Sequence, residues 1–202
     1  MINLTYNGHS CFTLDFDGYT IVVDPFTGVP GYKELKLTAN EVLCSHGHGD
    51  HNYVKAVDVI GGDRPAGLEV VEISSFHDPE GGKLRGSNIL RIFKYNGLSV
   101  MHCGDIGCIP TEEQLLLMKN LDCVLIPVGG YYTMEPKECK KFLSLIKPKL
   151  VIPMHYRTDK TGYGEIGTVD DFTDLMGSSK ELKNSALELT GKETGICILQ
   201  AK

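Results

Sequence analysis

The sequence of 202 residues contains no apolar run that approaches the roughly 18 residues of a membrane-spanning helix. Its beginning, MINLTYNGHSCF, lacks the basic stretch and the following apolar run of about 7 to 15 residues that a signal peptide needs. Both absences argue against export and against insertion into a membrane. We therefore expect a cytoplasmic protein with no membrane partner.

Positive charge is scarce as well. The 20 lysines and arginines are outnumbered by 26 aspartates and glutamates, which gives a formal net charge of −6. A surface that neutralises many phosphates needs the opposite balance. Nucleic acid is therefore not expected as a partner, and a small molecule is the expected substrate. No pattern in the sequence indicates an oligomeric state.

Paired cysteine motifs are missing too. The seven cysteines are an odd number without a CxxC pair, and several lie inside apolar runs, as Cys123 does in LDCVLIPV. This pattern is typical of buried free thiols in a reducing compartment. We interpret the cysteines as core residues.

What the sequence does contain indicates an α/β protein with a single domain over residues 1–202. The length and the 42% hydrophobic content suffice for one sizeable core. Residues 12–16 alternate between apolar and polar, and Asp17-Gly18 supplies a hairpin turn. Further strands are predicted at residues 19–24, 41–45, 68–74, 88–95, 98–102, 121–128 and 149–154.

Helices separate the later strands. Thr111 and Gln114 form a capping box ahead of LLLM. Pro136 suits the first turn of a helix that continues to residue 147 and ends before Pro148. Strands first, and then strands that alternate with helices, predict sheets covered by helices.

The stretch LCSHGHGDHN, residues 43–52, carries the strongest functional signal. Glycines separate its polar residues and let the chain bend sharply after the predicted strand, so that one turn can aim several side chains at one point. Imidazole and carboxylate are ligands of divalent metals. The candidate ligands in this turn are His46, His48, Asp50 and His51.

Further ligands are expected at other strand ends. Asp105 in VMHCGDIG and His155 in KLVIPMHYRT each follow an apolar run. Two histidines compete for the remaining place. His77 in EISSFHDPE is preferred over His102, because His102 lies inside its strand and better suits the core or a support of the ligands. Asp24 in VVDP is either such a support or an ordinary turn residue.

These motifs resemble the metallo-β-lactamase fold superfamily over most of the chain. The resemblance includes HGHGDH, the later His77, the Gly-Asp pair at Asp105 and His155 after IPM. GHSCFTLDFDGYTIVVDPF and IPVGGYYTMEP look like the branch of small Zn-dependent hydrolases related to ascorbate-6-phosphate lactonase. The resemblance implies an αββα sandwich of two mixed β-sheets flanked by helices, with the metals at one edge of the sheets.

Carried over to the matching positions, the resemblance implies two divalent ions. One would be held by His46, His48 and His77 and the other by Asp50, His51 and His155, with Asp105 bridging them. Two such ions about 3.5 to 4 Å apart share a water and lower its pKa towards about 7, which gives a bridging hydroxide for hydrolysis. Zinc suits these ligands best, and Mn²⁺ or Fe²⁺ fits the same set. Asp50 is also the expected catalytic residue.

Substrate selection is expected in the glycine-bearing loops 25–40, 78–88 and 156–167. Arg85 and Arg157 are candidates for binding an anionic substrate group, against the simpler reading that both are solvated. Tyr132 and Tyr156 are candidate hydrogen-bond donors to a developing oxyanion, against a role in packing.

The leading hypothesis is therefore a cytoplasmic metal-dependent hydrolase of a small ester, lactone or phosphoester. A phosphodiesterase or nuclease-like enzyme uses the same metals, but the acidic balance and the lack of a basic, aromatic-rich patch disfavour it. A catalytically inactive metal-binding regulatory protein is the third hypothesis, which the complete ligand set disfavours.

Overall fold

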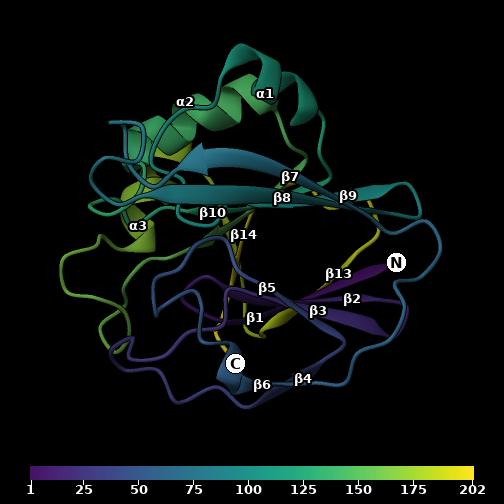
Figure 1. Cartoon of the computed structure of the whole chain (residues 1–202). Coiled ribbons are helices and arrows are strands. Elements are labelled where there is room, and N and C mark those ends of the chain that lie inside the picture. The colour runs from purple at the N-terminus through teal and green to yellow at the C-terminus, as the bar shows by residue number, and fades with distance from the viewer.

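Two mixed β-sheets face each other in the computed structural model, which describes residues 1–202 (Figure 1). The first sheet has the strand order β13 (Ala186–Leu189), β1 (Ile2–Gly8), β2 (Cys11–Phe16), β3 (Tyr19–Val23) and β5 (Glu41–Leu43). The second has the order β12 (Lys180–Leu182), β14 (Gly195–Leu199), β11 (Leu150–Met154), β10 (Cys123–Pro127), β9 (Leu98–His102), β8 (Ser87–Tyr95) and β7 (Glu69–Phe76).

Two tight hairpins set the antiparallel parts of these sheets. Asp17-Gly18 joins β2 to β3, and Asn96-Gly97 joins β8 to β9. All four residues have positive φ values, between 49° and 97°. Positive φ at both central positions matches the right-handed twist of paired strands, which is why Asx-Gly pairs favour hairpins. The hairpin at Asp17-Gly18 was predicted from the sequence and is confirmed, and the strands predicted at residues 88–95 and 98–102 flank the second hairpin.

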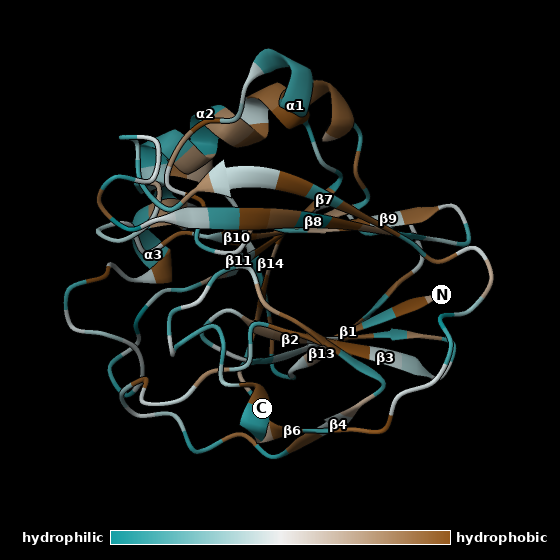
Figure 2. Ribbon diagram, in the orientation of Figure 1, coloured by the Kyte–Doolittle hydropathy of each residue, from teal (hydrophilic) through white to brown (hydrophobic).

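The main core lies between the two sheets. Alternate residues of β1 and β2, such as Leu4 and Leu14, are fully buried there against Phe93 and Leu125 of the second sheet. The hydrophobic residues gather along the facing strands, whereas the connecting loops are largely hydrophilic (Figure 2). Burial of this apolar surface fixes the two sheets face to face, and with them the strand ends that carry the polar motifs.

Three helices cover the outer face of the seven-stranded sheet: α1 (Glu112–Leu117), α2 (Pro136–Ile146) and α3 (Val169–Met176) (Figure 1). The predicted capping box of Thr111 and Gln114 opens α1. Pro136 opens α2, which buries Phe142 on its inner side and ends at Lys147. No helix is long and apolar enough to cross a membrane.

The predicted fold class is confirmed, with one difference in its layers. Residues 25–40 and 53–60 form the outer cover of the five-stranded sheet, and this cover contains the 3₁₀ turn η1 (Val54–Ala56) and a small ribbon of β4 (Leu37–Ala39) and β6 (Val57–Val59). Phe26 and Val29 are buried there against Cys11 and Val22 of the sheet. The long loop predicted at residues 25–40 therefore packs as a layer of its own.

Candidate metal centre

Strands from both sheets end at one edge of the sandwich, and each delivers a polar residue there. The residues that follow β3, β5, β7, β9 and β11 include Asp24, His46, His77, Asp105 and His155. Strand ends suit such a site because the sheets hold the backbone rigidly up to the last residue before the side chain. Residues far apart in the sequence are brought together in this way.

Asp105 lies at the middle of the cluster. Its Oδ2 atom is 3.0 Å from Nε2 of His77, 3.2 Å from Nε2 of His51 and 3.3 Å from Nε2 of His155. Ligand atoms about 2.0 to 2.1 Å from a tetrahedral zinc ion lie about 3.3 to 3.4 Å apart. The spacing around Asp105 is therefore close to that of atoms that share a metal.

Two groups of ligand atoms flank Asp105, each with its atoms within 4.8 Å of one another. One group is His46, His48 and His77, and the other is His9, Asp50, His51 and His155. All seven metal ligands predicted from the sequence thus lie in one cluster. His102 lies outside these groups, since its Nε2 is 2.8 Å from the carbonyl oxygen of Ser10.

Several buried atoms of the cluster have no hydrogen-bond partner: Nε2 of His46, Nε2 of His51 and Oδ1 of Asp105. His51 Nε2 lies 3.2 Å from Asp105 Oδ2, yet the two atoms are not oriented for a hydrogen bond. Unpaired buried polar atoms are costly, and coordination to a cation removes that cost. The residues therefore fit a divalent metal for two reasons: their side chains are of the types that coordinate such ions, and several of their buried atoms lack a hydrogen-bond partner.

Neighbouring groups orient three of the histidines through their other ring nitrogen. Nδ1 of His51 is 2.9 Å from Oδ2 of Asp24, and Nδ1 of His46 is 2.9 Å from Oγ of Ser45. Nδ1 of His77 is 3.1 Å from the carbonyl oxygen of Tyr132. In each case the contact at Nδ1 orients the ring so that Nε2 points at the middle of the cluster. Outer partners of metal-binding histidines orient the ring in the same way. Asp24 thus supports the histidine turn.

The electrostatics of the cluster are set by the close pairing of carboxylates and imidazoles. Burial raises the pKa of Asp105, but the adjacent His155 and His51 outweigh it and hold the pKa well below its usual value. Burial lowers the pKa of His51, but Asp105 and Asp24 raise it well above the usual value. Burial lowers the pKa of His46 to about 4. Asp105 and Asp24 therefore favour the protonated form of His51 when no metal is bound.

Two glycines permit the close approach of the chains around Asp105. A Cβ atom on Gly104 would lie 2.3 Å from Oδ1 of Asn88, which accepts a hydrogen bond from the backbone N–H of Asp105. A Cβ atom on Gly107 would lie 2.4 Å from the backbone of His77. Any side chain at either position would push the aspartate loop away from the cluster.

A pocket of about 360 Å³ opens onto the cluster. Its lining residues are His48, Asp50, His77, Arg85, Asp105, Tyr132, His155 and Tyr163. The Arg85 guanidinium lies 5.8 Å from the centre of the Tyr132 ring and donates a hydrogen bond to the carbonyl oxygen of Tyr131. Arg85 and Tyr132 were both expected at the substrate site, and the structure places both beside the candidate ligands.

The loop that carries Arg85 is fixed by one buried carboxylate. Asp78 accepts hydrogen bonds of 2.8 to 3.1 Å from the backbone N–H groups of Glu80, Gly82, Leu84 and Arg85. Such a ring of donors holds a loop in one conformation. The arginine is therefore presented from an ordered loop rather than from a freely moving one.

Tyr156 and Arg157 do not reach the pocket. Tyr156 is 6% exposed and packs in the core beneath the helices, because its side chain points away from the edge that His155 faces. Arg157 pairs through its backbone with Gly167 and is absent from the pocket lining. The structure therefore does not bring these two residues to the pocket, and a substrate role for them stays an untested prediction.

Two residues of the site were missed by the sequence reasoning. Tyr163 lines the pocket, and burial together with Asp50 raises its pKa to about 12. His9 is fully buried beside Asp50. The available signal for His9 was its place after a glycine between two strands, and nothing local marks Tyr163.

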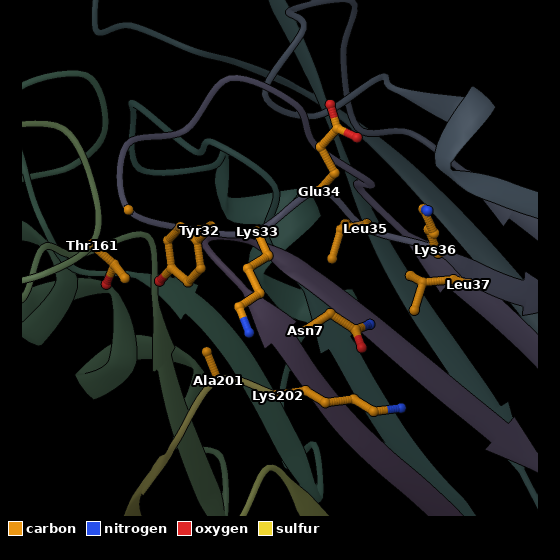
Figure 3. A pocket seen from close by; sticks show the side chains of 11 residues that line it. Asn7, Tyr32, Lys33, Glu34, Leu35, Lys36, Leu37, Thr161, Ala201 and Lys202 are labelled. Atoms are coloured by element: carbon orange, nitrogen blue, oxygen red, sulfur yellow. The ribbon is translucent and has the colours of Figure 1, made fainter.

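A larger cavity of about 410 Å³ lies elsewhere on the molecule (Figure 3). Tyr32, Lys33, Asn7 and Lys202 lie around it, and its lining contains no histidine, cysteine or aspartate. It therefore offers none of the ligands gathered at the strand ends. Candidate metal ligands line the smaller pocket.

Comparison with known proteins agrees with this geometry. The sequence model of the beta-lactamase superfamily domain matches residues 3–155, and the chain belongs to this superfamily. Within it, a UPF0173 metal-dependent hydrolase of Thermococcus onnurineus is 30% identical, over 78% of this chain and 86% of the relative. A second, from Carboxydothermus hydrogenoformans, is 28% identical over 91% of this chain and 97% of the relative.

A solved structure supports the same assignment. The crystal structure of a candidate Zn-dependent hydrolase of the metallo-β-lactamase superfamily from Thermotoga maritima is 34% identical. It covers 100% of both chains with a TM-score of 0.78. Together with the relatives, it shows that the present chain is a metal-dependent hydrolase of this superfamily.

Proposed function

We propose that this hydrolase cleaves a small ester, lactone or phosphoester in the cytoplasm, with two divalent ions, preferably zinc, at the strand-end cluster. The observation that carries the proposal is the pair of ligand groups on either side of Asp105, at the floor of a pocket with an arginine on its wall. Seven free cysteines, five of them buried, support a reducing compartment.

The residues divide into two ligand sets. We assign one ion to His46, His48 and His77 and the other to Asp50, His51 and His155, with Asp105 between them. Bound ions of this kind supply a hydroxide nucleophile at neutral pH and polarise the carbonyl or phosphoryl oxygen of the substrate. Mn²⁺ or Fe²⁺ would be accepted by the same donors.

Asp50 is the more exposed of the two carboxylates that line the pocket. Its side chain is 20% exposed, whereas that of Asp105 is only 3% exposed. Burial raises the pKa of Asp50, but the hydrogen bond with His9 and the nearby His51 hold it below its usual value. Asp50 therefore stays ionised and can accept a hydrogen bond from the attacking water, which orients that water towards the substrate.

The pocket walls indicate a small, anionic substrate. A volume of about 360 Å³ is at the lower end of the range for small-molecule sites. Arg85 has a charge that can pair with a carboxylate or phosphate, and the hydroxyls of Tyr132 and Tyr163 can donate hydrogen bonds to oxygens of the substrate. A polymeric substrate is disfavoured by the small pocket and by the net charge of −6.

The test is hydrolysis of a simple lactone beside a chromogenic phosphodiester by metal-reconstituted protein. Asp50→Asn is the variant, and Asp170→Asn, on the exposed side of α3, is the control. Lactone turnover that is lost only in Asp50→Asn would support the proposal. Phosphodiester turnover with the same pattern would favour a phosphodiesterase. A metal-loaded protein inert to a broad panel of esters, lactones and phosphoesters would favour a regulatory metal-binding protein.

A further inference from the structure

His9 lies at the metal centre but outside the two ligand sets assigned above. It sits in the short turn between β1 and β2, with a left-handed backbone conformation of φ 52°. Its side chain is 0% exposed and does not line the pocket. A non-glycine residue in this conformation costs energy, and such positions persist only where the surrounding structure enforces them.

Three hydrogen bonds hold the turn that carries His9. The hydroxyl of Tyr6 and the backbone N–H of His155 both donate to the carbonyl oxygen of His9, at 3.0 and 2.9 Å. Nε2 of His102 is 2.8 Å from the carbonyl oxygen of the next residue, Ser10. The backbone of His9 is therefore tied directly to that of the candidate ligand His155.

The ring of His9 is directed at one carboxylate. Its Nε2 lies 3.4 Å from Oδ2 of Asp50, and no other carboxylate oxygen lies within 4.0 Å. One face of the ring packs against His155, with 4.2 Å between ring centres, and Tyr163 and Phe26 meet it edge-on. These neighbours leave the imidazole one orientation.

The pattern of partners also fixes where the ring proton lies. Nδ1 of His9 is buried and has no hydrogen-bond partner. A proton on Nδ1 would be a buried donor without an acceptor, whereas a proton on Nε2 is offered to the Asp50 carboxylate. The tautomer with Nε2–H is therefore the one that the structure accommodates.

We propose that His9 is a positioning residue for Asp50, and that its Nε2–H sets the affinity of the metal site formed by Asp50, His51 and His155. The inference rests on the metal centre proposed above. The ligand atom of His9 lies within 4.8 Å of those of Asp50, His51 and His155, but its Nε2 is directed at Oδ2 of Asp50. His51 and His155 bring Nε2 within 3.3 Å of Asp105, whereas His9 has no such contact, so we assign His9 as a donor to Asp50 rather than as a ligand. Its hydrogen bond holds the partly exposed carboxylate in one orientation towards the ion.

The test compares two variants of similar size with the wild-type protein. His9→Gln retains an N–H donor near the position of Nε2, whereas His9→Leu fills the same space without a donor. Ser10→Ala is the control, since the neighbouring Ser10 hydroxyl is buried and has no partner. Each protein is stripped with a chelator and titrated with Zn²⁺ against a competing indicator, and the bound metal is counted by elemental analysis. Thermal unfolding of the metal-free variants checks that each is folded.

We expect His9→Leu to bind one of its two ions about 10- to 100-fold more weakly, which is the usual cost of losing an outer partner. We expect His9→Gln to stay close to wild type and Ser10→Ala to match it. Wild-type affinity for both ions in His9→Leu would overturn the inference, as would a loss in His9→Gln as large as in His9→Leu. A wild-type protein that takes up no zinc would instead contradict the metal centre itself, so that the two failures are distinguishable.

Discussion

Asp24→Asn tests most directly how the histidine turn prepares the metal site. Asp24 is 0% exposed, and its Oδ1 accepts the backbone N–H of Ser45 at 2.6 Å. Its Oδ2 accepts the Ser45 hydroxyl at 2.6 Å and lies 2.9 Å from Nδ1 of His51. The substitution keeps the size of the side chain and replaces one acceptor with a donor.

The new amide has no good orientation. If its oxygen keeps the Ser45 N–H, its NH₂ group faces Nδ1 of His51 and moves the ring proton of His51 to Nε2, the atom that we assign to the metal. If the amide turns over, its NH₂ group faces the Ser45 N–H instead, and two donors oppose each other. Loss of a buried charged hydrogen bond costs about 1.5 to 3 kcal/mol. Loss of an outer partner of a histidine ligand weakens metal binding about 10- to 100-fold.

The assay is zinc titration of the metal-free variant, together with its free energy of unfolding in urea. Asp122→Asn is the matched control. Asp122 is 6% exposed and, like Asp24, accepts hydrogen bonds from both the backbone N–H and the hydroxyl of a serine, here Ser99. Asp122 lies outside the cluster of candidate ligands. We expect both variants to lose stability and only Asp24→Asn to lose metal affinity. Zinc affinity in Asp24→Asn equal to that of the wild type would refute the reasoning.

Three further predictions concern pH, substrate and packing. In the metal-free protein, the pKa values of His51 and His77 are raised above 6.5. Their contribution to the free energy of unfolding is therefore complete below pH 6.5 and is lost as the pH rises through the raised values. Thermal unfolding in chelator across a pH series should show this loss, and the affinity for zinc should rise over the same range. Arg85→Ala should raise KM for an anionic ester at least about tenfold while leaving a neutral ester nearly unchanged, and equal effects on both would exclude an anion contact. Gly31→Ala should lower the free energy of unfolding by more than about 1 kcal/mol, since its Cβ would lie 1.7 Å from a backbone oxygen of the facing loop. Gly28 has a similar φ and open space around it, so Gly28→Ala should lower the free energy of unfolding clearly less. Equal losses for the two variants in urea unfolding would contradict the clash.

The elements that could be predicted from the sequence are those whose signal is local. The hairpin at Asp17-Gly18 and the capping box at Thr111 depend on a few adjacent residues, and both appear where expected. The strands β4, β6 and β12 have three residues each, which is too short for any alternation to show. Helix α3 was not predicted, although Val169, Phe172 and Met176 stand at helical spacing, because its eight residues give only about two turns of the pattern.

The candidate site divides in the same way. HGHGDH brings its donors together within one turn, and Asp105 and His155 could be predicted because each follows an apolar strand. The contact between His9 and Asp50 spans 41 positions and arises only because β1, β2 and β3 lie in order beside β5. Tyr156 illustrates the opposite failure, because one position of difference turns a side chain from the edge of a sheet into the core.

Three residues at this edge of the sandwich have a left-handed backbone conformation. His9, Asp24 and His155 all have φ values of 51° or 52°, although none is a glycine. Each follows the end of a strand, and in each case the left-handed conformation turns the chain at the point where it reaches the cluster. A glycine would relieve the strain at any of the three, but it would also remove a candidate ligand, a support of a candidate ligand, or the neighbour of Asp50. The strain is therefore retained at the positions where a side chain is needed, and the two packed sheets supply the rigidity that maintains it.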